Sequence, residues 1–199
     1  MNRKESILDA ATQLFAEKGF EATPTAEVAK IAGVSEGTIF HHFKTKNGVF
    51  IHIISRVMNL YYQKVRAEAE NAGSGLEAIE QMIRLHFHFI NEHSMEFLVI
   101  FRDLPAHLLK PDLPHRKVIQ DQVEKIFALL AAAIDRGQSD GSIRTVPTRQ
   151  TAFILRGLLI GLTRQRLQSL LQVPDLSEEA VEFCHRSLAA SASITSQDI

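Results

Sequence analysis

Apolar residues recur at helical spacing along almost the whole chain. In the N-terminal stretch they step at intervals of three and four, at positions Ile7, Leu8, Ala11, Leu14 and Phe15. This spacing places them on one face of a first helix. Gly19 follows, and we expect it to end that helix because glycine adopts a left-handed backbone without strain at Cβ.

Two short helices and one long helix are predicted next. Thr25 is placed to cap the segment AEVAKIA, and Gly33 to end it. Ser35 is placed to cap the segment EGTIFHHF. A long helix then begins near Asn47, with apolar residues along one side.

The rest of the chain reads as further helices separated by turn-forming segments. Helical patterns cover about 76–92, 95–109, 115–136 and 148–171, and Ser177 is placed to cap a last helix through about 190. The breaks are NAGSG, KPDLP, RGQSDGS and VPDLS, and the tail SASITSQDI is expected to fray. With no convincing alternating strand pattern, we predict an all-α fold of about nine helices. We place a domain boundary at residue 46, between a small domain (1–46) and a larger bundle (47–199).

Composition narrows the class of protein. The chain has 199 residues, 45% hydrophobic and 23% charged, with a net charge of −1, so a nucleic-acid partner would need a local basic patch. Cys184 is the only cysteine, which excludes an intrachain disulfide and a zinc finger and fits a reducing compartment. The N-terminus has no apolar signal core, and no apolar run reaches the roughly 20 residues of a membrane span. We therefore expect a cytoplasmic protein without a membrane partner.

Residues 25–46 have the features of a helix-turn-helix. Ala29 is small where two helices would cross closely, and Gly33 permits the sharp turn between them. Four apolar residues are placed to bury the inner corner: Val28, Ala32, Val34 and Ile39. In such a motif the second helix lies in the major groove of DNA, with its N-terminal residues at the base edges.

The helix-turn-helix and the segments around it carry a specific family resemblance. The segments ILDAATQLFAEKGF, EVAKIAGVSEGTIFHHFKTK and NGVF, within residues 7–50, resemble the DNA-binding region of the tetracycline-repressor (TetR) family of transcriptional regulators. The remainder is similar only in architecture. The resemblance implies a three-helix DNA-binding domain followed by a larger ligand-binding and dimerisation bundle, acting as a homodimer on a double-stranded DNA operator.

Three positions depart from the usual family pattern. Thr25 stands where the family often has an aliphatic residue, so it either weakens the inner corner or adds a cap. Phe40 replaces a common tyrosine, which removes a hydroxyl and leaves a ring that could pack on a thymine methyl group. Glu36 occupies a position that is often basic or polar; its carboxylate repels the DNA backbone but can accept from cytosine N4.

The surface expected to contact DNA follows from this register. Its residues are Thr25, Ser35, Glu36, Gly37, Thr38, Phe40, His41, His42, Lys44 and Lys46. His42 is expected at a phosphate, as the resemblance implies, whereas His41 faces either base edges or solvent. Lys44 and Lys46 are expected at phosphates, Lys46 most strongly. Gly37 would allow close backbone approach, at a cost of about 1 kcal/mol relative to alanine in a helix.

The histidines suggest metal binding only at first sight. His41 and His42 are adjacent, and His86 and His88 are two apart, so neither helical pair shares a face. We therefore expect no metal site and no cofactor.

Residues of the predicted bundle could line an apolar pocket and form a dimer interface, called the seam below. The predicted pocket residues are His86, Phe89, Phe97, Phe101 and Arg102, although each phenylalanine alone could equally be core, and Arg102 could instead pair with an acid. In ILRGLLIGL two glycines four apart would let another helix approach closely. The predicted seam residues are Phe153, Gly157, Leu158, Gly161, Leu162, Val181 and Phe183, with an ordinary intrachain core as the alternative.

These observations favour a DNA-binding transcriptional regulator that is not an enzyme. We expect a repressor, released from a pseudo-palindromic operator by a small hydrophobic or amphipathic effector. One alternative is an architectural DNA-binding protein without a ligand, which a fully packed bundle would favour. A small helical enzyme that uses histidine as acid or base is the second alternative, although no nucleophile–base motif supports it.

Overall fold

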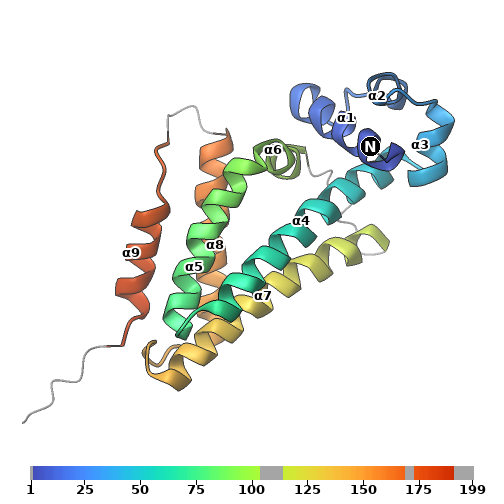
Figure 1. The fold of residues 1–199 in the computed structure, drawn as a ribbon. Helices are drawn as coiled ribbons and strands as arrows, with labels where there is room; N and C mark the ends of the chain where they lie inside the picture. The colour runs from blue at the N-terminus through green and yellow to red at the C-terminus, as the bar shows by residue number, and fades with distance from the viewer. Residues whose placement is uncertain (1, 104–113, 169–172, 191–199) are drawn as a thin grey trace, which may run out of the picture.

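The computed structural model of the chain describes residues 2–103, 114–168 and 173–190 (Figure 1). The described residues form nine helices and no strand, which confirms the all-α prediction. The helices are α1 (Arg3–Lys18), α2 (Thr25–Ala32), α3 (Glu36–Phe43), α4 (Lys46–Asn71), α5 (Gly75–Glu92), α6 (Ser94–Asp103), α7 (Pro114–Asp140), α8 (Thr148–Gln168) and α9 (Ser177–Leu188). None of these helices, over the ranges described, is long and apolar enough to cross a membrane.

The three short helices enclose a core of their own at one end of the molecule. The rings of Phe15, Phe20 and Phe50 meet at its centre, with centroids 5.1 to 6.2 Å apart. Phe50 belongs to α4, and the buried side chains of residues 49–51, 53 and 54 all pack into this core. The first turns of α4 are therefore part of the N-terminal unit.

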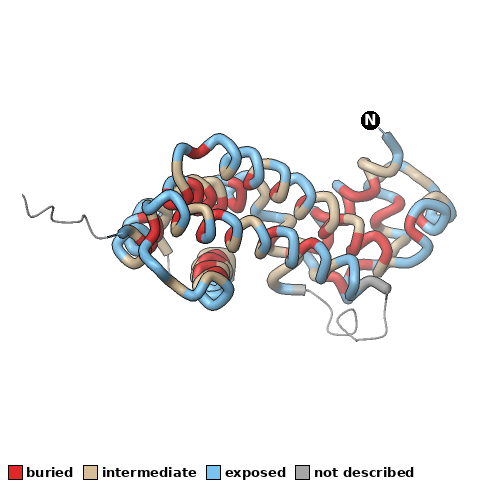
Figure 2. Tube along the Cα trace, turned by 90° about the horizontal axis from the view of Figure 1, so that it is seen from below, coloured by how far each residue is buried: buried red, intermediate tan, exposed pale blue. Residues whose placement is uncertain are grey.

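A second core lies within the bundle formed by the remainder of α4 with α5, α7, α8 and α9. Figure 1 shows α4 running from the N-terminal helices into this bundle, and Figure 2 shows buried turns at both ends of the molecule. Helix α6 joins the two cores, because Val99 packs into the first and Phe97 into the second. Two helices thus link the N-terminal unit to the bundle through buried side chains.

Most of the predicted helix ends are confirmed. Gly19 ends α1 with φ 90°, and Gly33 ends α2 in the left-handed conformation with φ 66° and ψ 34°. Ser35 caps α3, because its hydroxyl oxygen accepts from the backbone N–H of Thr38. The long helix begins at Lys46, one residue before the predicted start.

Two predicted caps are wrong. Thr25 is the first residue of α2, the cap position is Pro24, and no side chain caps that end. Likewise Ser177 is the first residue of α9; its N–H donates to Asp175 Oδ1 at 3.0 Å instead. Each residue lies one position too far inside its helix for its hydroxyl to accept from the following turn.

Helix α7 continues beyond its predicted end at 136, through RGQSD to Asp140, so the break falls at the end of the predicted segment RGQSDGS, where Gly141 has φ 80°. Gly137 lies inside the helix because another chain segment passes too close for a side chain. A Cβ on Gly75 would lie 2.0 Å from Gly137 N, and a Cβ on Gly137 would lie 2.5 Å from the Ile143 side chain. Packing, not helix termination, requires this glycine. The predicted helix at 104–109, the end of the predicted helix at 169–171 and the tail at 191–199 lie outside the described residues.

Candidate functional site

Helix α3 is fixed by its buried side and presents its other side to solvent. Ile39 and Phe43 are buried in the N-terminal core, at 0% and 3% exposure. The opposite side carries predicted DNA-contacting residues, all of them exposed: Ser35, Glu36, Gly37, Phe40, His41, His42 and Lys44. Phe40 is 45% exposed, which is high for so large an apolar side chain.

A shallow depression lies between this helix and the start of the chain. Asn2 and Arg3 form one side of it, and the other side is lined by Ser35, Gly37, Thr38, His41 and His42. The hydroxyls of Ser35 and Thr38 are 2.9 Å apart and form one hydrogen bond, so both are held at the N-terminal end of α3. The depression therefore combines a helix N-terminus, a basic residue and several hydrogen-bonding groups, all of which suit a phosphate.

Gly37 has no packing reason to be glycine. The nearest atom to a Cβ placed there would be Ser35 Oγ at 3.8 Å, an ordinary contact. Glycine within a helix costs about 1 kcal/mol relative to alanine. Within the described fold, a side chain would thus fit at this position, and no contact of the chain itself requires glycine there.

Two of the predicted contacts are engaged within the chain. The Thr25 hydroxyl donates to the carboxylate of Glu36, which ties the first residue of α3 to the first residue of α2. The bond engages Oε1 of Glu36, so its second carboxylate oxygen is the one left to accept from a base. The Thr25 hydroxyl thus does not cap α2. It instead links α2 to α3, the two helices of the motif.

Lys46 was predicted to contact a phosphate, but its ammonium group binds within the chain. Its Nζ donates to the carbonyl oxygens of Phe20, Glu21 and Thr23 at 2.9, 3.3 and 3.3 Å, and it lies 4.5 Å from the centroid of the Phe20 ring. Three acceptors match the three N–H donors of an ammonium group. These carbonyls follow the end of α1, where no helical donor is available to them. Lys44, which is exposed, remains the lysine on the surface of α3.

A cavity of about 360 Å³ opens inside the bundle, between α4, α5, α6, α7 and α8. Three predicted pocket residues line it: His86, Phe97 and Phe101. The prediction was wrong for Phe89, which is 0% exposed and packs in the core with its ring 5.2 Å from that of Tyr61.

Arg102 was also predicted for the pocket and does not line it. Phe97 and Phe101 are four residues apart and share a face of α6, so the next residue points elsewhere. The Arg102 guanidinium instead donates to the carbonyl oxygens of Phe15 and Ala16, the latter at 2.8 Å. These carbonyls lie in the last turn of α1, so Arg102 joins the helix beside the cavity to the N-terminal unit.

A chain of buried hydrogen bonds crosses one wall of the cavity. Tyr61 OH lies 2.8 Å from His86 Nδ1, and His86 Nε2 lies 2.8 Å from Thr163 Oγ1. Burial lowers the pKa of His86 to about 4 and raises the pKa of Tyr61 above its ordinary value. The imidazole is thus neutral at pH 7, and the phenol keeps its proton. A Tyr61 hydroxyl that donates to Nδ1, with Nε2–H donating to Thr163, satisfies all three groups.

Three polar cavity residues were missed by sequence reasoning: Gln122, Arg156 and Arg164. Arg156 and Arg164 interrupt an apolar run, and their spacing from Ile160, four residues on each side, puts all three on one face of α8. That spacing was the available signal. Gln122 is 8% exposed, and its Oε1 has no hydrogen-bond partner among the residues that the structure describes.

The outer side of α8 and α9 carries exposed apolar residues. Phe153, Ile154 and Phe183 are 52%, 69% and 61% exposed, and a Cβ placed on Gly157 or on Gly161 would have no neighbouring atom within 4 Å. Leu158 and Leu162 are partly buried against the chain's own core. Val181 is 5% exposed and faces that core, so its assignment to the seam is wrong.

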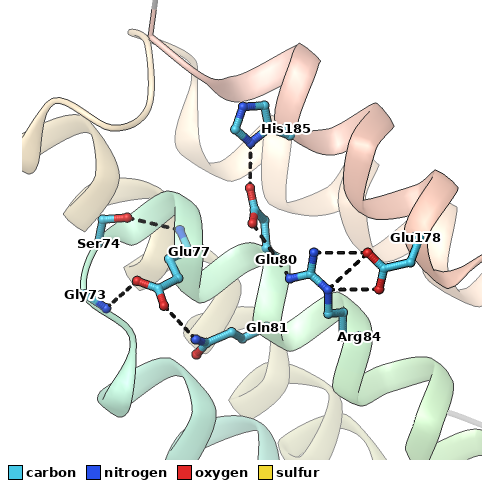
Figure 3. A network of polar contacts seen from close by, with 8 residues as sticks. All are labelled: Gly73, Ser74, Glu77, Glu80, Gln81, Arg84, Glu178 and His185. Carbon is cyan, nitrogen blue, oxygen red and sulfur yellow. Dashed lines mark hydrogen bonds and ion pairs between the residues drawn. The ribbon is translucent and has the colours of Figure 1, made fainter.

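Polar contacts hold α9 against α5 (Figure 3). Arg84 Nε and Nη2 donate to the carboxylate of Glu178, and His185 Nδ1 lies 2.6 Å from Glu80 Oε1. Exposed pairs of this kind contribute about 0 to 1 kcal/mol each. They orient α9 more than they stabilise it. Among the described residues, no three His, Cys, Asp or Glu side chains converge as metal ligands would.

Comparison with protein families matches most of the chain to two models. Residues 7–53 match the model described as bacterial regulatory proteins of the tetR family. Residues 72–164 match the model described as a tetracyclin repressor-like C-terminal domain. The first range covers most of α1, all of α2 and α3 and the start of α4, and the second runs from α5 into α8, the helices that form most of the cavity wall.

Known proteins agree with these matches. The transcriptional repressor KstR2 of Mycolicibacterium smegmatis is 26% identical over 143 residues, 72% of this chain and 68% of the relative. The structure of FadR from Bacillus subtilis in complex with stearoyl-CoA superposes with a TM-score of 0.80 at 21% identity, covering 90% of this chain and 96% of that one. That of AibR in complex with isovaleryl coenzyme A and operator DNA superposes with a TM-score of 0.74 at 19% identity, covering 96% and 100%. With both halves matched to family models, this chain belongs to the TetR family of transcriptional regulators.

Proposed function

We propose that the protein is a dimeric repressor whose affinity for its operator falls when an amphipathic effector enters the bundle cavity. The observation that carries this proposal is the connection between the cavity and the DNA-reading end. Phe97 and Phe101 line the cavity, and Arg102, the next residue on the same helix, bonds the last turn of α1.

The DNA-binding part of the proposal rests on the exposed side of α3. Ser35 and Thr38 lie at its N-terminal end, where a helix-turn-helix meets the base edges and the flanking phosphates. Gly37 supports close approach, because the fold itself leaves room for a side chain there. We assign His42 and Lys44 to phosphates, and Phe40 to apolar contact with a base.

The dimer part rests on the apolar side of α8 and α9. Phe153 and Phe183 are too exposed for a surface that stays in water, and the two exposed glycines of α8 leave room for a partner helix. A two-fold dimer formed there would set two α3 helices on successive major grooves, about 34 Å apart.

The regulatory part requires an effector that binds one conformation better than the other. An effector against Phe97 and Phe101 would shift α6, and with it the Arg102 contact that orients α1. Coupling of about 1–3 kcal/mol, or roughly 5- to 150-fold in operator affinity, is typical. FadR and AibR, crystallised with acyl-coenzyme A ligands, make acyl compounds the first effectors to test.

The two alternatives have less support. A ligand-independent architectural protein would not need the cavity of about 360 Å³ in its bundle. A histidine-dependent enzyme would need an accessible base beside the cavity, whereas His86, the histidine that lines the cavity, is kept neutral by burial and has both ring nitrogens bonded to Tyr61 and Thr163. A regulator of this kind would act in the cytoplasm, together with the chromosome.

A gel-shift experiment with DNA from upstream of the protein's own gene tests the proposal. We expect a discrete complex that survives competition by unrelated DNA and that is released by an acyl ligand. Binding that is sensitive to salt but indifferent to sequence would contradict it.

A further inference from the structure

Arg156 is a partly buried cation that faces the cavity. It lies on α8 between apolar neighbours, and no carboxylate of the described residues forms an ion pair with it. Of the described residues that line the cavity, none is an aspartate or a glutamate. Burial lowers the pKa of Arg156, because a guanidinium withdrawn from water without an anion loses solvation that nothing replaces.

A second cation and a buried amide lie along the same cavity. Arg164 is eight residues after Arg156 on the same face of α8, about 12 Å along the helix axis. It is exposed, and its Nε donates to Gln168 Oε1 at 3.0 Å. Gln122, on α7, is 8% exposed and has an amide oxygen without a partner among the described residues. Because Gln122 also lines the cavity, its amide oxygen is available to accept a hydrogen bond from the contents of the cavity.

Apart from Tyr61 and His86, which are hydrogen-bonded to each other, the rest of the described wall is apolar. Ile54 and Met58 from α4, Phe97 and Phe101 from α6, and Ile126 and Leu130 from α7 surround the space. Such a wall suits a flexible hydrocarbon chain better than a polar or compact charged molecule. One side of the cavity therefore offers positive charge, while its other sides offer apolar contact.

We propose that the effector is an anionic amphiphile, an acyl chain held between α4, α6 and α7 with its negative group at the arginines of α8. This inference rests on the proposed function and specifies the chemistry of its effector. The same chemistry occurs in a free fatty acid, whose carboxylate would bind Arg156, and in an acyl thioester of coenzyme A, whose phosphates would bind the exposed Arg164. A cationic amphiphile would meet like charge on α8, and a neutral one would leave Arg156 without an anion.

Isothermal titration of the full chain with four ligands tests this proposal. The ligands are dodecanoate, dodecanoyl-CoA, dodecanol and dodecyltrimethylammonium, which carry the same chain length with different head groups. We expect at least one of the two anions to bind roughly tenfold or more tightly than dodecanol, in keeping with a charged hydrogen bond. The cation should bind most weakly.

Variants identify the source of the anion. Arg156→Met should remove the preference for dodecanoate over dodecanol if the free acid is the effector. Arg164→Met should instead weaken dodecanoyl-CoA if the thioester is the effector. Arg66→Met removes an exposed arginine of α4, whose side chain pairs with Glu70 away from the cavity, and should change neither. Should Arg156→Met fail to fold, Arg156→Lys retains the charge and should bind dodecanoate with intermediate affinity.

Two outcomes would overturn the inference. Equal binding of dodecanol and both anions would show that head-group charge is not recognised. An anion preference that survives unchanged in both Arg156→Met and Arg164→Met would place recognition elsewhere. Both outcomes leave the proposed repressor intact as long as the operator gel shift persists, whereas failure of specific operator binding would reject the proposed function whatever the ligands do.

Discussion

At the scale of single residues, the most informative positions are those where the local structure would prefer something else. Gly37 lies in a helix with open space around it, Arg156 is a partly buried cation facing an apolar cavity, and Gln122 has a buried oxygen without a described partner. Each is unfavourable for the isolated chain. A ligand could supply the missing partners of Arg156 and Gln122, and close approach of DNA would give a reason for Gly37, so these residues point to binding more than to folding.

Replacing Gly37 with alanine should separate stability from DNA binding. We expect thermal unfolding to show a gain of up to about 1 kcal/mol, because alanine is the better helix former and its Cβ meets no close neighbour. Operator affinity, measured by fluorescence anisotropy on the same preparation, should fall because the methyl group would hold the backbone away from DNA. An alanine variant that binds the operator as tightly as the original would contradict this explanation.

The buried His86 should make stability depend on pH. Its pKa is lowered by burial from 6.5 to about 4, so between these values the unfolded chain binds a proton that the folded chain does not. The unfolding free energy therefore has its full value with respect to His86 above pH 6.5. It decreases by about 3 kcal/mol in total as the pH falls towards 4. Denaturant unfolding at several pH values measures this loss.

His86→Gln is the matched variant, since glutamine can hydrogen-bond but does not titrate. Its unfolding free energy should depend less on pH between 4 and 6.5 than that of the original protein. Identical pH profiles for the two proteins would mean that other groups, and not His86, account for the loss.

At the scale of elements, α4 and α6 are helices that bury side chains in both the N-terminal core and the bundle core. Helix α4 contributes Phe50 to one core and Val65 to the other, and α6 contributes Val99 and Phe97 in the same way. Arg56 of α4 adds ion pairs to Glu5 and Asp9 at 2.9 and 2.8 Å. A change in the bundle can therefore reach α1 along either helix.

Loss of the Arg102 side chain should loosen the last turn of α1. In Arg102→Met we expect faster amide hydrogen exchange in peptides that cover Phe15–Lys18, because two of the carbonyls there lose their guanidinium donors. Arg84→Met is the control, since Arg84 bonds Glu178 between α5 and α9. If exchange at the end of α1 is the same in both variants, Arg102 does not hold the N-terminal unit.

At the scale of the whole molecule, pattern-based prediction succeeded where the determining interactions are local. Helical periodicity and the capping residues Gly19, Gly33 and Ser35 were sufficient for the element order and the helix-turn-helix. Prediction failed where contacts with a segment distant in the sequence determine the structure. The helical position of Gly137 depends on Gly75 and Ile143, and the position of Lys46 depends on carbonyls more than twenty residues earlier in the chain.

The cavity shows the same limit. His86, Phe97 and Phe101 were predictable because aromatic residues on facing helices are the usual lining of a pocket. Phe89 was not distinguishable from them by type or spacing, and only the packing around Tyr61 places it in the core. Arg156 and Arg164 were not predicted to line the pocket, because polar residues in an apolar helix are more often solvent-exposed than directed inward.

The dimer should depend on the apolar side of α8. Phe153→Glu should weaken self-association by roughly a hundredfold or more, since a two-fold interface loses two buried rings and gains two charges. Analytical ultracentrifugation measures this change. Met95→Glu is a matched control, because Met95 is also 52% exposed but lies on α6. A Phe153→Glu protein that remains dimeric would exclude this side of α8 as the seam.

Because α4 packs in two cores, the point at which two related regulators can exchange DNA-binding domains by recombination is restricted. A crossover in the loop before Lys46 would replace the side chains at 49–51, 53 and 54 that complete the first core, and would separate Lys46 from the loop whose carbonyls it binds. A crossover beyond Arg56 would carry that core together with its ion pairs to α1. Chimeric regulators joined inside α4, past Arg56, should therefore fold more often than those joined in the loop before it.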